Sequence, residues 1–247
     1  MNITENHVRR LLTVVDHGLV RGLGVREPGK FCIEAAVCYA LELPHSDDPK
    51  CVAQPLRRLK IRLNDSAWSN NMARAKGMRR LAVAQLGSAG VLDKKEFTLR
   101  VVTLAIQVYV PYALRCAASV KGNEAHAEVL ESAAVACENE PTRANAVKAR
   151  NVARSAYAAA ASYAADVAAA AAATVAAEAS YADAASYAAD IAAAAVADAV
   201  YAAFVADDAY AARAKLRDEV LSGFAEYVVQ ILIDMKAPGC QWLWLTE

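Results

Sequence analysis

One long segment of the chain is so rich in alanine that it limits what the chain can fold into. Between residues 153 and 212, 34 of 60 residues are alanine, and the segment contains neither glycine nor proline. Because alanine has the highest helix propensity, we expect helix throughout this segment. A single helix of that length would measure about 90 Å, whereas a compact domain of this chain length has a radius of gyration of about 18 Å. We therefore predict that the segment folds back as two helices with a turn near 176–184, rather than projecting as one arm.

The same segment repeats itself without forming a heptad pattern. The sequence ASYAADVAAAA at 161–171 recurs as ASYAADIAAAA at 185–195, but the tyrosines do not fall on one helical face. A long parallel coiled coil is therefore disfavoured. Acidic residues interrupt the segment and alanine drives membrane insertion only weakly, so we expect no membrane span.

Helical periodicity and capping signals cover most of the remaining chain. Asp48 followed by Pro49 is typical of a helix start, and Pro111 should interrupt a long helix. The apolar end APGCQWLWL should dock on the core. We expect an all-α protein with about six to eight core helices, in which residues 1–140 and 213–247 form one domain and 141–212 are an inserted Ala-rich hairpin or arm. The expected helices lie near 4–20, 31–43, 49–61, 67–85, 94–120, 124–138 and 213–236.

The formal net charge of zero hides an uneven distribution. Residues 1–154 carry an excess of eight positive charges, whereas residues 155–212 carry seven acids and no Lys or Arg. The N-terminal part could attract an anion such as a nucleotide, although an ordinary solvated surface explains the same excess. No region is basic enough to indicate binding of duplex nucleic acid.

The cysteines point to a reducing compartment and away from metal chemistry. None of the six is in a CxxC pair, and none lies at zinc-ligand spacing from a histidine. The sequence MNITENHVRR does not look like a signal peptide. We therefore expect a cytoplasmic protein with reduced thiols, without a metal or cofactor. The cysteines are Cys32, Cys38, Cys51, Cys116, Cys137 and Cys240.

The strongest functional signal is a basic run in residues 57–80, which contains eight Lys and Arg but only one acid. Arginine forks bind phosphate groups in a bidentate manner. If two helices bring these bases together across the intervening connector, they frame an anion site with two polar residues and a tryptophan stacking face. Solvated helix faces and an ordinary turn with a helix cap are the alternative interpretation. The predicted ligand-binding residues are Arg58, Arg62, Asn64, Asp65, Trp68, Arg74 and Arg79.

A second set of residues could support thiol chemistry. Cys32 lies at a helix start, where the helix dipole favours a thiolate, and His45 and Asp47 follow that helix. These three residue types are the minimum for a cysteine nucleophile with its base. The alternative is that Cys32 is a buried core thiol and His45 a loop residue.

Four motifs together resemble a family of uncharacterised bacterial and phage proteins. They are GKFCIEAAVCYALELPHSDDPKCV at 29–52, RLNDSAWS at 62–69, ARAKGMRRLAVAQLGS at 73–88 and APGCQWL at 237–243. The resemblance implies no catalytic residues, because the family carries no established activity. A mobile-element origin would imply a host-interaction or signal-sequestering role.

These observations favour a non-enzymatic binding module over an enzyme. The expected ligand is small, anionic and nucleotide-like. A thiol hydrolase or transferase using Cys32 is the first alternative. The second is a structural protein that forms homo-oligomers through its Ala-rich helices.

Overall fold

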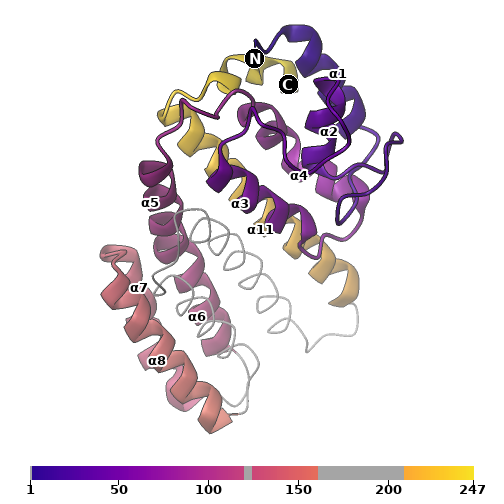
Figure 1. Ribbon diagram of the computed structural model, residues 1–247. Coiled ribbons are helices and arrows are strands. Elements are labelled where there is room, and N and C mark those ends of the chain that lie inside the picture. The colour runs from indigo at the N-terminus through magenta and orange to yellow at the C-terminus, as the bar shows by residue number, and fades with distance from the viewer. Residues whose placement is uncertain (1, 120–123, 161–208) are drawn as a thin grey trace.

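The computed structural model describes the main chain of residues 2–119, 124–160 and 209–247 (Figure 1). Within these ranges the protein is all-α, as expected, with nine α-helices and no β-strand. The predicted turn near 176–184 lies outside the described residues. The helices are α1 (Glu5–Val15), α2 (Ile33–Ala40), α3 (Gln54–Asp65), α4 (Asn71–Ala84), α5 (Lys94–Leu104), α6 (Val110–Ser119), α7 (Ala127–Asn139), α8 (Arg143–Ala160) and α11 (Ala209–Asp234).

The N-terminal helices and the C-terminal segment form one packed body. Helix α4 lies alongside α11, and α1 packs against both α2 and α4 (Figure 1). The apolar chain end forms a 3-10 helix, Pro238–Thr246, that packs on α4 and buries Leu243. The predicted docking of this end is confirmed, and the two chain termini lie close together.

A long interrupted helix leads from this body to a second group of helices. Helix α5 continues into a π-helical turn, Ala105–Tyr109, and then into α6. The turn comes immediately before Pro111, where an interruption was predicted. Proline donates no main-chain hydrogen bond and its ring crowds the preceding turn, and a π turn accommodates such a break.

Helices α6, α7 and α8 pack through small side chains. Helix α8 buries Ala146, Ala149 and Ala153 at helical spacing, and α7 packs between α6 and α8. The predicted domain division at 140/141 falls between α7 and α8, two helices that pack against each other, and the division itself stays a prediction. Among the described residues, Lys94–Ser119 is the one helical stretch long and apolar enough to span a membrane, and half of its apolar window is buried in the protein.

The predicted start of the third helix is wrong. Helix α3 begins at Gln54, with Pro55 in its first turn, and Pro49 lies in the preceding turn. Either proline suits a helix start, because a first-turn residue has no intrahelical partner for its N–H. Contacts with residues distant in sequence determine which of the two prolines begins the helix. The Ala53 N–H donates to Ser88 Oγ at 2.9 Å, and Asp48 pairs with Arg57 instead of capping a helix.

Candidate functional site

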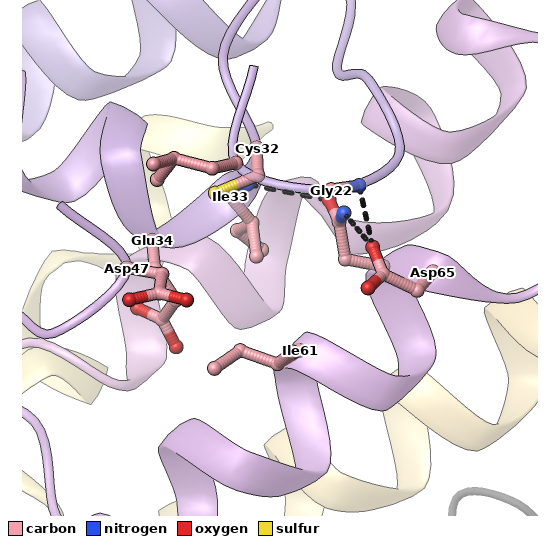
Figure 2. A pocket seen from close by; sticks show the side chains of 9 residues that line it. Gly22, Cys32, Ile33, Glu34, Asp47, Ile61 and Asp65 are labelled. Atoms are coloured by element: carbon pink, nitrogen blue, oxygen red, sulfur yellow. Dashed lines mark hydrogen bonds between the residues drawn. The ribbon is translucent and has the colours of Figure 1, made fainter. Parts of the chain in front are cut away.

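A small acid-lined cavity lies where the first turn of α2 faces the second half of α3. Its volume is about 60 Å³, and the loop containing Gly22 and Leu23 closes one side. Three carboxylates line it, from Glu34 on α2, Asp47 in the following loop and Asp65 on α3. Figure 2 shows Glu34 and Asp47 side by side, with Asp65 on the other side of the cavity. Of the described residues that line the cavity, none is basic.

A buried ion pair links one cavity-lining residue, Glu34, to Lys60 of α3. The Glu34 Oε1 and Lys60 Nζ atoms lie 2.9 Å apart, and both side chains are 0% exposed. Among the described residues, Glu34 Oε2 has no hydrogen-bond partner, and Lys60 Nζ has none besides the pair. Burial raises the pKa of Glu34 and lowers that of Lys60, while each partner's charge opposes the shift of the other. A buried carboxylate oxygen without a donor is costly, so a ligand that donates to it would relieve that cost.

Asn64 and Asp65 hold the cavity wall together. The Asn64 side chain accepts from the Ile33 N–H at 3.3 Å and donates to the Val20 carbonyl at 2.9 Å. Asp65 Oδ1 accepts from the Gly22 N–H at 2.8 Å and from Asn64 Nδ2 at 2.9 Å (Figure 2). The hydrogen bonds of Asn64 and Asp65 therefore connect the end of α3 to the 19–31 loop and to the start of α2. Both residues lie in the last turn of α3, not in a connector as expected.

Arg74 lies behind this wall and connects two segments of the chain through hydrogen bonds. Its guanidinium is almost fully buried and donates to the Asn64 carbonyl at 2.7 Å and to the Leu19 carbonyl at 2.8 Å. Charged donors to buried carbonyls make strong hydrogen bonds. They also leave little of the guanidinium available to a ligand.

The other residues predicted to bind an anion lie apart from the cavity. Arg79 pairs with Asp16 at 2.8 Å and donates to the Thr246 carbonyl at 2.7 Å, where it helps to hold the chain end. Trp68 is buried, and its Nε1–H donates to the Leu63 carbonyl at 2.9 Å. Arg58 is half-buried and Arg62 exposed on α3, and each has a partner within the protein. The structure thus brings Asn64, Asp65 and Arg74 together, and an anion site built from the full set stays a prediction.

The alternative thiol site places Cys32 and Asp47 at the same cavity. Cys32 caps the N-terminus of α2, and its Sγ accepts from the Ala35 N–H at 3.3 Å. Burial nevertheless raises the pKa of Cys32 to about 11, with the nearby Glu34 and Asp47 charges adding to the effect. Desolvation therefore outweighs the helix dipole, and the thiol is protonated at neutral pH.

His45 is held away from a role as base by other contacts. Its Nε2 lies 3.2 Å from the Gly24 carbonyl oxygen, and its ring lies 5.9 Å from that of Phe31. His45 is not among the residues that line the cavity. Thiol catalysis stays a prediction, because the backbone hydrogen bonds that favour a thiolate at Cys32 are outweighed by burial.

A larger groove between α4 and α11 is a weaker candidate site. It encloses about 930 Å³, and its acids and bases balance. Arg80 of the basic run pairs across it with Glu226 at 3.0 Å, and Ser69 donates to Asp218 at its end. Since the charges balance and two of the three bases pair with acids of the same groove, the groove favours no ligand of either charge.

The sequence analysis did not identify the buried ion pair beside the cavity. Glu34 was not among the predicted site residues, and Lys60 was only one member of the basic run in residues 57–80. A signal was present for Glu34, which is the one charged residue in FCIEAAVCYAL at 31–41. Charged residues are almost never fully buried unless they are paired, so this position predicts a buried partner of opposite charge. Lys60 carried no such signal, because it stands among Arg57, Arg58 and Arg62.

Among the described residues, no cluster of His, Cys, Asp and Glu side chains could hold a metal ion. No family model, no curated protein and no solved structure matches this chain. The resemblance to bacterial and phage proteins therefore stays a prediction. The site must be interpreted from its own geometry.

Proposed function

We propose that the protein is a non-enzymatic binding module and that the cavity between α2 and α3 holds the positively charged end of a small ligand. The observation that carries the proposal is the Glu34 Oε2 atom, which is buried beside the cavity and has no hydrogen-bond donor among the described residues. A cationic N–H donor would satisfy this oxygen and form a charge-assisted hydrogen bond.

The charge around the cavity supports a cation and opposes an anion. Glu34, Asp47 and Asp65 line it, while Lys60 supplies one opposing charge through its pair with Glu34. Arg57 is also near Glu34 but pairs with Asp48. A ligand cation would lower the repulsion among the carboxylates in a site of reduced dielectric. The proposed ligand is therefore a cation, whereas the basic run predicted an anion. The difference arises because Arg74 and Arg79 of that run bind the Asn64 carbonyl and Asp16 within the protein.

Binding alone accounts for the features of the cavity. The protonated Cys32 thiol serves as a helix cap, and His45 is directed elsewhere. A module that binds without chemistry also fits the sequestering role that the resemblance implies. All six cysteines are free thiols, so we place this module in the cytoplasm, where thiols stay reduced.

Thermal unfolding of the full chain tests the proposal. Propylammonium and guanidinium chlorides are compared with sodium phosphate and nucleotides at constant ionic strength. A ligand present at about 100 times its dissociation constant adds about 2.7 kcal/mol of stability, which is about 5–10 °C for a chain of this size. We expect at least one cation to raise the melting temperature. A shift caused by the anions alone would refute the proposal.

A matched pair of variants ties the shift to the cavity. Asp47 and Glu27 are both exposed acids, but only Asp47 lines the cavity. We expect Asp47→Asn to reduce the cation-induced shift and Glu27→Gln to leave it unchanged. An equal loss in both variants would mean that the shift reflects general surface charge.

A further inference from the structure

We propose that the ligand presents a primary ammonium group on an aliphatic stem. This inference rests on the proposed function and narrows its ligand class. The acceptors at the base of the cavity, the apolar residues at its mouth and its size together point to this chemistry.

Two neighbouring acceptors suit the geometry of an ammonium group. The carboxylates of Glu34 on α2 and Asp47 in the next loop lie side by side, whereas Asp65 lies across the cavity (Figure 2). A primary ammonium group has three N–H donors that point in different directions, so one nitrogen can donate to both neighbouring carboxylates. A guanidinium is a planar fork that suits a single carboxylate. A quaternary ammonium has no N–H to give to Glu34 Oε2, and no aromatic residue lines the described cavity to bind its methyl groups.

The same acceptors do not suit a metal ion. Among the described residues, no group of His, Cys, Asp and Glu side chains lies close enough together to hold one. A metal ion such as calcium needs a larger set of oxygen ligands around one point. An ammonium group needs only the two neighbouring carboxylates of Glu34 and Asp47 as acceptors.

The mouth of the cavity suits an aliphatic stem. Leu23 lines it and is 42% exposed, although it is a large apolar side chain. Ile61 of α3 lies half-buried in the lining (Figure 2). Since a water needs about 10–15 Å³ of such space, the cavity of about 60 Å³ has room for the ammonium and a few methylene groups. A longer stem would pass Leu23 and cover it from solvent.

Calorimetric titration of the full chain with a homologous series tests the inference. The probes are methyl-, propyl-, butyl- and hexylammonium, with butyltrimethylammonium as the matched quaternary cation. Burial of each methylene contributes about four-fold in affinity, so we expect affinity to rise with stem length until the stem leaves the mouth. We expect butyltrimethylammonium to bind at least tenfold more weakly than butylammonium.

Two variants of one loop locate the stem. Leu23 and Val25 are both exposed in the loop before α2, but only Leu23 lines the cavity. We expect Leu23→Ala to weaken hexylammonium binding about tenfold and to leave methylammonium binding unchanged. Val25→Ala should change neither. Equal effects of the two substitutions would overturn the stem contact.

The outcomes separate this inference from the proposed function. Binding of small cations without dependence on stem length, or equal binding of the quaternary cation, overturns the inference and leaves the proposed function standing. Failure of every cation to bind overturns both.

Two further probes identify the source of the ammonium group. Tighter binding of Nα-acetyl-lysine amide indicates a lysine side chain of a polypeptide, whereas tighter binding of 1,5-diaminopentane indicates a free diamine. Either result supports the alkylammonium chemistry.

Discussion

The carboxylate of Glu34 and the ammonium of Lys60 lie 2.9 Å apart with neither side chain exposed to solvent. The pair joins the first turn of α2 to the middle of α3, and Glu34 also lines the cavity. Its two members are desolvated together, so each depends on the other for compensation. This mutual dependence makes the pair the most sensitive point of the site.

Removing one member of the pair should be strongly destabilising. We expect Lys60→Met to lower the free energy of unfolding by about 3–5 kcal/mol, because it leaves a buried carboxylate without a counter-charge. The double variant Glu34→Gln/Lys60→Met should recover most of this loss. Urea denaturation of the single and double variants measures both values. Additive losses in the double variant would contradict the pairing.

The loss in the free energy of unfolding caused by Lys60→Met, called the deficit below, should also depend on pH. Burial raises the pKa of Glu34 above its ordinary value, and the loss of Lys60 removes an opposing influence. A folded-state pKa that is raised above the unfolded value gives stability at low pH that is lost as pH rises through the folded value. We therefore expect the deficit to be smaller at about pH 5 than at about pH 8. An equal loss of stability at the two pH values would show that Glu34 stays ionised without its partner.

Arg74 should contribute stability instead of ligand binding. Arg74→Met removes donors to the buried Leu19 and Asn64 carbonyls and should cost about 2–4 kcal/mol. Arg80→Gln is the control, because Arg80 and its partner Glu226 are both more than a third exposed and such pairs contribute less than about 1 kcal/mol. Urea denaturation compares the two variants. Equal stabilities, with loss of phosphate binding in Arg74→Met alone, would favour the anion site.

The Cys32 thiol should be slow to react in the folded protein. A pKa of about 11 reduces the thiolate fraction about a hundredfold relative to an ordinary cysteine near pH 8. We expect iodoacetamide labelling of Cys32, mapped by mass spectrometry, to be far slower in native protein than in urea. His45→Gln should leave the native rate unchanged. Rapid labelling at neutral pH that depends on His45 would support the thiol enzyme.

Gly239 should be required for docking of the chain end. A Cβ at this position would lie 2.4 Å from the Val83 carbonyl oxygen and 2.6 Å from that of Ala84. Because both are main-chain atoms, the Pro238–Thr246 segment would have to move away from α4. We expect Gly239→Ala to cost about 1–3 kcal/mol and to expose the chain end to limited proteolysis.

Gly223 offers the matched control for this substitution. It lies inside α11, and a Cβ there would approach only the Tyr109 hydroxyl, at 3.9 Å. Gly223→Ala should therefore raise stability by up to about 1 kcal/mol through helix propensity. Thermal unfolding measures both changes, which should have opposite signs. A similar loss of stability in both variants would mean that the space available to the added Cβ does not determine either effect.

Local signals along the chain determined the helical architecture. The expected helix at 4–20 is α1, and its buried face carries Val8, Leu11 and Val15 at helical spacing. Asp93 caps α5 by accepting from the Lys95 and Glu96 N–H groups. Gly87 follows α4 in a left-handed conformation with φ of 73°. Such signals depend on neighbours three or four residues away, so the sequence contains them in full.

Only the tertiary structure decided where α3 begins and which charges meet. Pro49 and Pro55 are equivalent local signals, and the contact of Ala53 with Ser88 selects the second. The basic run predicted converging arginines, but Arg74 and Arg79 bind carbonyl and carboxylate groups distant in sequence. Glu34 and Lys60 form a pair because α2 and α3 pack together. A charge in a sequence is solvated or buried according to what the rest of the chain brings against it, and that arrangement does not exist before folding.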